Sequence, residues 1–225
     1  MAYDALVFDN DGVLTTPTTH EVLVGAIADA FDAVGVSDPP RSHVETLIAP
    51  TVDELRSIAL AHDVEISRLW EARERAAIEA QYRSVREGTK RLYDDVDAVR
   101  SLSIPRAIVS NNQHETIANI VEFFDLDDFD PWIGREPTID GIRRKKPRPY
   151  YLERALDALD VRSPLFVGDS RADVAAASAA DVDVAFLRRP HRTDYELDVQ
   201  PTYQIDSLDA LAELVTTAEP SVDRT

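Results

Sequence analysis

The chain has 225 residues, of which 44% are hydrophobic, and it carries a formal net charge of −18. The length permits one large domain, or a core with an inserted smaller domain, and the hydrophobic content suffices for a substantial core. The acidic charge disfavours binding to nucleic acid or to anionic membrane surfaces. The absence of cysteine excludes disulfides, thiolate catalysis and cysteine metal sites, and no stretch approaches the length of a membrane span.

The N-terminus lacks the basic region and apolar core of a signal peptide, so we expect a cytoplasmic protein. Only three lysines, Lys90, Lys145 and Lys146, stand against 42 Asp and Glu residues. Scarce lysine with abundant acid is typical of proteins from halophiles, and we therefore expect a halophilic protein. The alternative is an ordinary acidic enzyme of a mesophile.

Short apolar runs alternate with amphipathic helical patterns along most of the chain. Apolar residues recur with helical spacing between Ile117 and Phe124 and again between Leu152 and Leu159. The expected strands lack strict polar alternation, which is typical of strands buried on both faces of a parallel sheet. We therefore predict an α/β fold with a doubly wound parallel sheet. The apolar runs expected to form strands are 5–8, 107–110, 165–168, 184–187 and 203–205.

Residues 16–89 interrupt this alternation because every pattern there is helical. A helix is expected from His20 to Val34, ending at Gly35, and a long charged helix from Ser67 to near Gly88. Between them, Thr51 and Glu54 have the spacing of a capping box at a helix start. We predict a core domain of residues 1–15 and 90–225 with a helical cap domain of residues 16–89, and a frayed polar tail from 219 to 225.

Acidic residues follow two of the predicted strands. Asp9 and Asp11 come directly after the first apolar run, and Asp169 follows the run at 165–168, with Asp173 four residues later. The carboxyl ends of parallel strands are where ligands bind in open α/β sheets. Several carboxylates brought together repel one another, so their proximity implies a divalent cation.

Polar residues end a third predicted strand, at 107–110, and basic residues precede a predicted helix. The run at 107–110 ends in Ser110 and Asn111, whose hydroxyl and amide groups suit a phosphoryl oxygen, although Ser110 could equally be a helix cap. Lys146 precedes Pro147, and a compact ammonium there suits phosphate or a group of carboxylates. Lys145 is the competing candidate, and a solvated basic patch is the alternative.

The ordered set of these motifs resembles the haloacid dehalogenase superfamily of phosphohydrolases. It consists of Asp9-x-Asp11-Gly12, Ser110-Asn111, Lys146-Pro147 and Gly168-Asp169-x-x-x-Asp173. The resemblance covers nearly the whole chain, and the helical insertion resembles the cap of the phosphoglycolate-phosphatase-like subfamily. Thr15-Thr16-Pro17 departs from the Asp-Ser pair of many relatives, which weakens the assignment of any particular substrate.

The resemblance implies a phosphatase that hydrolyses a small phosphorylated metabolite with Mg²⁺ as cofactor, and phosphoglycolate is a candidate substrate. Asp9 would attack phosphorus and form an aspartyl-phosphate, and Asp11 would act as acid and base and offer a backbone carbonyl to the metal. Phosphoryl oxygens would be held by Ser110, Asn111 and Lys146. The implied metal-site residues are Asp9, Asp11, Asp169 and Asp173.

Other functions remain as alternatives. A dehalogenase of the same superfamily lacks an acid two residues after the first aspartate, so Asp11 argues against it. A sugar-phosphate phosphomutase shares the acid pair and differs in transferring phosphate to a sugar phosphate. A phospho-receiver domain is shorter and has no inserted cap, and the full set of acids with Lys146 argues against a non-catalytic binding protein. The sequence makes no prediction of oligomeric state.

Overall fold

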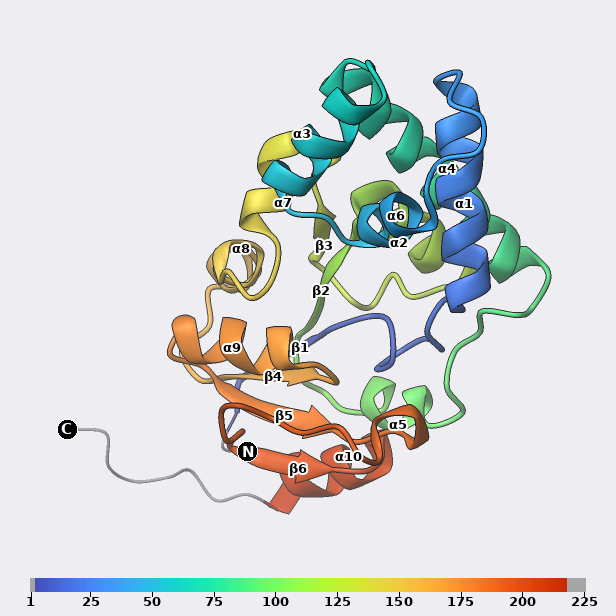
Figure 1. The fold of residues 1–225 in the computed structure, drawn as a ribbon. Coiled ribbons are helices and arrows are strands. Elements are labelled where there is room, and N and C mark those ends of the chain that lie inside the picture. Colours follow the sequence, from blue (N-terminus) through green and yellow to red (C-terminus); the bar gives the residue numbers. More distant parts are fainter. Residues whose placement is uncertain (1–2, 218–225) are drawn as a thin grey trace.

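The computed structural model describes residues 3–217, and these contain a six-stranded sheet in the order β3-β2-β1-β4-β5-β6 (Figure 1). All neighbouring strands pair in parallel, which confirms the predicted α/β fold. The edge strand β3 was not among the predicted strands. The strands are β1 (Ala5–Phe8), β2 (Arg106–Gln113), β3 (Trp132–Arg135), β4 (Pro164–Gly168), β5 (Asp183–Leu187) and β6 (Tyr203–Ile205).

Alternate residues of the central strands enter two different hydrophobic clusters. Leu6 and Phe8 of β1 join the cluster covered by α5 (Val96–Arg100), α6 (His114–Phe124) and α10 (Leu208–Thr217). Val7, between them, joins the cluster covered by α8 (Tyr150–Leu159) and α9 (Arg171–Ala179). Because side chains of a strand alternate between faces, both faces of the sheet are buried, and the apolar strand sequences follow from this.

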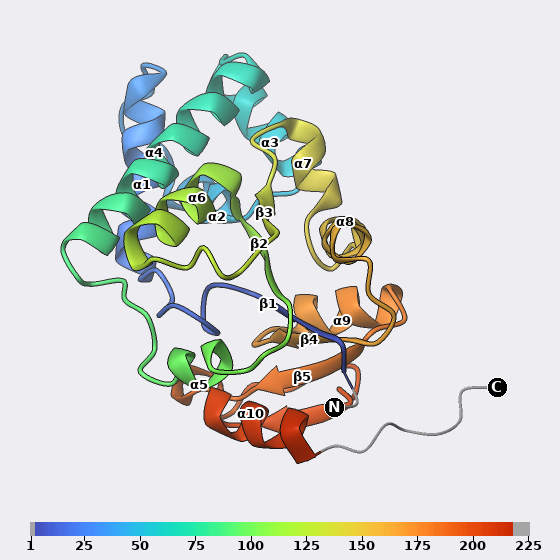
Figure 2. The same cartoon turned by 180° about the vertical axis from the view of Figure 1, so that it is seen from behind.

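The first four helices of the chain, between β1 and α5, gather beside α7 (Ile139–Arg144), as Figure 2 shows from behind. Their apolar faces form a separate cluster that includes Phe31, Leu55 and Trp70 and also Ile142 of α7. This cluster is separate from the two clusters of the sheet, but Ile142 belongs to the predicted core domain, so the division into a core and a cap domain stays a prediction. The helices are α1 (His20–Ala33), α2 (Arg41–Ile48), α3 (Val52–Ala61) and α4 (Ile66–Arg86).

The ends of these helices agree closely with the sequence patterns. The capping box of Thr51 and Glu54 forms at the start of α3. Helix α4 begins at Ile66 instead of Ser67, because Glu65 occupies the cap position and Ser67 lies in the first turn, where its hydroxyl contacts Glu65. The predicted frayed tail from 219 to 225 lies outside the described residues. Among residues 3–217, no helix has both the length and the apolar character needed to cross a membrane.

Candidate functional site

Three predicted site residues form a chain of ion pairs at the carboxyl ends of β1 and β4. The Lys146 ammonium lies 2.9 Å from Asp9 Oδ1 and 2.6 Å from Asp173 Oδ1. It also donates a hydrogen bond to the Val109 carbonyl of β2 at 3.0 Å. Lys146 is 3% exposed, so a buried cation stands between two carboxylates that would otherwise repel each other.

The burial of this cluster changes its protonation behaviour. Burial is the largest cause that raises the pKa of Asp9 to about 7, with smaller contributions from Asp173 and Asp169, while Lys146 opposes them. Burial alone would lower the pKa of Lys146, but Asp173 and Asp9 outweigh burial and hold it above its ordinary value. The site therefore holds Lys146 charged beside an Asp9 whose charge is costly without a further cation.

Asp169 completes an oxygen-rich cluster that fits a hard divalent cation. Asp9, Asp169 and Asp173 each offer a carboxylate oxygen, and these oxygens lie within 4.8 Å of one another. Mg²⁺ prefers oxygen ligands of this kind. Gly12 has a φ of +83°, and a Cβ there would lie 2.2 Å from Asp169 Oδ2, so only glycine lets the backbone approach this carboxylate.

The local sequence explains why Asp173 is so well placed. Ser170 caps α9, and its hydroxyl accepts from the backbone N–H of Asp173 while the Asp173 carboxylate accepts from the backbone N–H of Ser170. This capping box fixes the first turn of the helix and aims the other oxygen of Asp173 at Lys146. A Cβ on Gly168 would lie 2.3 Å from the Cβ of Asp173, so the strand end needs glycine for this contact.

The Asp11 side chain has different partners from the other acids. Its Oδ1 accepts hydrogen bonds from Lys90 Nζ at 2.6 Å and from Asn10 Nδ2 at 2.7 Å. Asp11 is outside the group of carboxylates that could share a cation among residues 3–217. Its side chain is thus positioned by the segment that follows α4 and not by the chain of ion pairs around Lys146.

Ser110 and Asn111 lie within β2, at its carboxyl end. Ser110 is 2% exposed, and its hydroxyl accepts a hydrogen bond from the Asn112 backbone N–H at 3.2 Å. The Asn111 side chain pairs with the backbone of Lys146 in both directions, since it accepts from the Lys146 N–H at 2.8 Å and donates to the Lys146 carbonyl at 3.0 Å. Asn111 therefore fixes the loop that carries Lys146 against the end of β2.

Three residues of the site were not identified from the sequence. Asp169 Oδ2 contacts His191 Nε2 at 2.8 Å and accepts from Arg192 Nε at 2.9 Å, and both partners lie in the 3₁₀ turn Pro190–Arg192. Lys90, which contacts Asp11, is 1% exposed. His191 and Arg192 follow β5 at the carboxyl edge of the sheet, so the rule that located the other residues could have located them. Lys90 carries no comparable sequence signal.

Known proteins with similar sequences are phosphatases. The family model described as haloacid dehalogenase-like hydrolase matches residues 3–181. A phosphoglycolate phosphatase of Neisseria meningitidis is 29% identical over 185 residues, covering 78% of this chain and 76% of that protein. The pyrophosphatase PpaX of Halalkalibacterium halodurans is 25% identical over 219 residues, covering 96% of this chain and 98% of that protein.

A solved structure shows the same fold. The crystal structure of CbbY from Rhodobacter sphaeroides in complex with phosphate superposes with a TM-score of 0.68 at 21% identity, covering 93% of this chain and 96% of that one. The family model spans most of the described residues, including the strand ends that carry Asp9, Ser110 and Asp169 and the loop that carries Lys146. The chain therefore belongs to the haloacid dehalogenase-like hydrolase family.

Proposed function

We propose that this phosphatase hydrolyses small phosphate monoesters with Mg²⁺, with Asp9 as the nucleophile and Asp11 as the acid and base. The observation that carries the proposal is the buried ion-pair chain of Asp9, Lys146 and Asp173 with Asp169 beside it. A reactive carboxylate needs a neighbouring cation that also attracts the phosphoryl group, and Lys146 meets both needs. Phosphoglycolate is the candidate substrate, supported by the name of the relative in Neisseria meningitidis.

The first chemical step in this proposal transfers the phosphoryl group to Asp9. A carboxylate oxygen of Asp9 attacks phosphorus, a new P–O bond forms to Asp9, and the P–O bond to the leaving oxygen breaks. Asp11 donates a proton to that leaving oxygen, so this oxygen becomes a neutral hydroxyl group of the departing alcohol. Lys146, Ser110 and the Asn111 backbone N–H hold the phosphoryl oxygens in line during the transfer.

The second step returns Asp9 to its starting state. Asp11, now a carboxylate, takes a proton from a water molecule, and the resulting nucleophile attacks phosphorus. The bond between phosphorus and Asp9 breaks, and inorganic phosphate leaves. Lys90 and Asn10 keep Asp11 in one position through both steps, because both donate to the same carboxylate oxygen.

A bound Mg²⁺ would be held by Asp9 and Asp169, with Asp173 nearby and the Asp11 backbone carbonyl as a further ligand. When bound, it supplies positive charge that offsets the charge of the phosphoryl oxygens. Asp169 Oδ2 accepts a hydrogen bond from the Arg192 guanidinium and contacts His191 Nε2, so this carboxylate has polar partners of its own beside the proposed metal site. The donor set is made of hard oxygens, which suits Mg²⁺ better than a softer metal.

The helical segment of residues 16–89 is proposed to act as a cap domain over the core of residues 1–15 and 90–225. Most of its apolar residues form a cluster separate from the sheet. Its Ala49 and Pro50 carbonyls accept hydrogen bonds from Lys145, which is next to Lys146 in the chain. A cap of this kind excludes water and selects the leaving group. The same segment brings α4 against α6 of the core.

Phosphate release from phosphate monoesters at high salt, with Mg²⁺ and with chelator, tests the proposal. We expect Mg²⁺-dependent release, no turnover in Asp9→Asn and a severe loss in Asp11→Asn, with the fold of both variants retained. Asp157→Asn, an exposed acid on α8, is the matched control and should behave as wild type. Near-wild-type activity in purified Asp9→Asn would show that Asp9 is not the nucleophile.

A further inference from the structure

The pairing of β2 with its neighbour β3 is irregular at the point where β2 enters the site. The ladder runs from Ile108 to Ser110 and resumes at Gln113, so Asn111 and Asn112 form a bulge between the two paired stretches. A bulge leaves its extra residues without ladder partners and re-aims neighbouring side chains, and bulges are common beside active sites. The bulge residues therefore need partners from outside the ladder to hold one conformation.

The peptide unit between Asn111 and Asn112 is hydrogen-bonded at both ends. Its carbonyl accepts from Arg135 Nε at 3.2 Å, and its N–H donates to Ser110 Oγ at 3.2 Å. Because a peptide unit is planar, a donor that fixes the direction of the carbonyl also fixes the direction of the N–H. Since Ser110 Oγ accepts this N–H, the hydroxyl keeps its own proton to donate to a phosphoryl oxygen.

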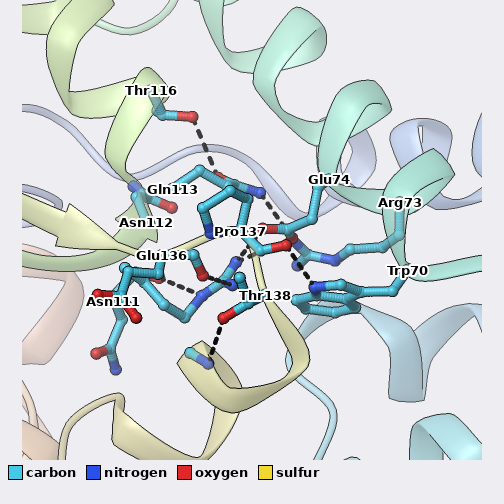
Figure 3. Close-up of polar contacts among 12 residues, drawn as sticks. Trp70, Arg73, Glu74, Asn111, Asn112, Gln113, Thr116, Glu136, Pro137 and Thr138 are labelled. Carbon is cyan, nitrogen blue, oxygen red and sulfur yellow. Dashed lines mark hydrogen bonds and ion pairs between the residues drawn. The ribbon is translucent and has the colours of Figure 1, made fainter. Parts of the chain in front are cut away.

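Arg135 is in turn held by the helical segment. Its Nη2 donates to both oxygens of Glu74 on α4, at 2.8 and 2.9 Å. Gln113 Nε2 also donates to Glu74, at 3.3 Å, and Figure 3 shows these two side chains where α4 passes the end of β2. Arg135 and Glu74 are each 4% exposed, so solvent does not compete for this ion pair.

Helix α4 also contacts the bulge directly. Gln81 Nε2 donates to Asn112 Oδ1 at 3.3 Å, and Gln81 Oε1 accepts from Thr18 Oγ1 at 3.0 Å. Gln81 is 2% exposed. The bulge is therefore held from α4 by two routes, through Arg135 and through Gln81, and its conformation depends on α4 being packed against the end of β2.

Stability alone is a weak reason for burying a charged pair at this place. A buried ion pair adds little net stability compared with apolar side chains of the same volume. What Arg135 supplies is direction, because the N–H groups of a guanidinium form a rigid fork. Its three nitrogens take three separate acceptors: Nη2 takes the Glu74 carboxylate, Nη1 the Glu136 carbonyl at 3.0 Å, and Nε the Asn111 carbonyl.

We infer, on the basis of the function proposed above, that Arg135 and Glu74 are positioning residues for the phosphoryl group. Glu74 fixes the Arg135 guanidinium, and Arg135 fixes the peptide unit of the bulge. That peptide unit orients the Ser110 hydroxyl toward the phosphoryl oxygen. Arg135 and Glu74 thus act through Ser110, and α4 takes part in aligning the phosphate site in addition to covering it.

The first test uses Arg135→Lys, which keeps a buried cation beside Glu74. An ammonium lacks the rigid fork that reaches both Glu74 and the Asn111 carbonyl, so the peptide unit loses its fixed direction. We expect kcat/KM for a phosphate monoester, and the calorimetric affinity for inorganic phosphate, each to fall about tenfold or more. Arg75→Lys, the same substitution at an exposed position of α4, is the control and should behave as wild type. Wild-type values in Arg135→Lys would overturn the inference.

A double-mutant cycle with Ser110→Ala separates positioning from a purely structural role. Once the hydroxyl is gone, Arg135→Lys should have little further effect on kcat/KM, whereas the effects of independent residues multiply. The loss of stability in urea should be the same with and without Ser110. Losses of kcat/KM that multiply in the double variant would assign Arg135 to stability alone and would overturn the inference.

Glu74→Gln repeats the cycle by removing the anchor of Arg135, and it decides the question if Arg135→Lys does not fold. Its control is Glu71→Gln, the same change at an exposed position of α4. We expect Glu74→Gln to lower kcat/KM in the wild-type background and to have little effect in Ser110→Ala. Multiplying losses here would also overturn the inference.

The outcomes distinguish this positioning role from the proposed phosphatase mechanism. Wild-type kcat/KM in Ser110→Ala would overturn the inference, while loss of turnover in Asp9→Asn would still support the mechanism. Near-wild-type activity in Asp9→Asn would contradict the mechanism instead. The affinity for inorganic phosphate would then still test Arg135, because calorimetry requires no turnover.

Discussion

The Lys90 ammonium lies 2.6 Å from the Asp11 carboxylate, and it joins the segment after α4 to the loop after β1. Around this contact the two connections between the helical segment and the sheet run side by side. The Thr16 N–H donates to the Arg91 carbonyl at 2.8 Å, and Thr15 forms an antiparallel bridge with Leu92. Lys90 also donates to Thr18 Oγ1, so one buried cation ties the proposed acid and base to both connections.

Replacing Lys90 by methionine should therefore affect both turnover and stability. Loss of the contact releases the Asp11 side chain, and we expect kcat to fall about 10- to 100-fold because the proton donor is no longer held in place. Asp11 loses a charged hydrogen-bond partner, so the free energy of unfolding should fall by about 1–3 kcal/mol. Steady-state kinetics and urea denaturation measure the two effects, with Arg41→Met, an exposed cation, as control. Wild-type kcat in Lys90→Met would rule out a positioning role.

Lys146, and not its neighbour Lys145, should carry the contact with the transferred phosphoryl group. Lys146 is paired with Asp9 and Asp173, whereas Lys145 points to the carbonyls of Ala49 and Pro50. Lys146→Ala should lower kcat/KM for every substrate by about 3 kcal/mol of transition-state stabilisation. The same measurement on Lys145→Ala should show a smaller loss, and a larger loss at Lys145 than at Lys146 would reverse the assignment.

Removing residues 16–89 should leave a core that folds but discriminates poorly among substrates. Thr15 and Leu92 are already bridged, so a short linker can join the new ends. We expect lower stability for three reasons. The deletion removes Val85 from the cluster that α5, α6 and α10 cover, Glu74 from its ion pair with Arg135, and the helices that cover Ile142. Circular dichroism monitors folding, and ratios of kcat/KM across several phosphomonoesters measure discrimination. Unchanged ratios in the deleted form would refute the role of the cap.

The ion pair of Asp95 and Arg189 should make stability depend on pH in the acid range. Arg189 donates to both oxygens of Asp95 at 2.6 and 2.8 Å, and the Leu208 N–H donates to the same carboxylate. Burial alone would raise the pKa of Asp95, but these partners hold it below its ordinary value. Because the pKa of Asp95 is lower in the folded state than in the unfolded state, the ion pair stabilises the fold fully at pH values above the unfolded pKa of roughly 3.9. It is lost as the pH falls through the folded value.

Asp95→Asn should isolate this contribution. The substitution leaves Arg189 buried without its anion, and the free energy of unfolding at neutral pH should fall by about 3 kcal/mol. The difference from wild type should be constant from neutral pH down to roughly pH 5 and should shrink below the unfolded pKa. Urea unfolding at several pH values measures it, with Asp157→Asn as the exposed control. A difference that grew on acidification would contradict the sign of this linkage.

The sequence predicted the parts of the fold that depend on local pattern. The strands at 5–8 and 165–168, the alternation of strands and helices, and the capping box of Thr51 can all be read from neighbouring residues. The strand β3 could not, because it is a short edge strand whose first half is only partly buried and which contains Gly134. The roles of Asp9, Ser110 and Lys146 stay predictions, although the structure pairs Lys146 with Asp9 and bonds it to the Val109 carbonyl, next to Ser110.

Some charged residues with partners far along the chain, in segments without a motif, were not recognised from the sequence. Helix α4 was expected only to be a long charged helix, and its pattern did not show that Arg73 and Glu74 are buried, with Arg135 of β3 paired to Glu74. Lys90, unlike Lys145 and Lys146, has no motif around it in the sequence. Only the fold places it against Asp11. Tertiary contact, and not local sequence, gives these charged residues their surroundings.

Salt should stabilise this protein, since a compact chain of net charge −18 repels itself. That repulsion is screened over roughly 10 Å at 0.1 M salt and roughly 3 Å at 1 M. All three lysines are engaged inside the structure, Lys90 with Asp11, Lys145 with loop carbonyls and Lys146 with Asp9 and Asp173. Surface acids therefore depend on arginine and on solvent cations for compensation.

We accordingly expect the melting temperature and the phosphatase activity to rise between 0.1 M and molar KCl. Thermal melts at several KCl concentrations measure the first effect, and phosphate release at the same concentrations measures the second. The ion pairs around Lys146 are buried, so salt should screen them little. The rise in melting temperature should therefore come from surface charges, and it should persist in Asp9→Asn. A mesophilic acidic enzyme would show little change over this range. A flat or falling melting temperature would therefore reject the halophilic interpretation and would leave the assignment to the hydrolase family unaffected.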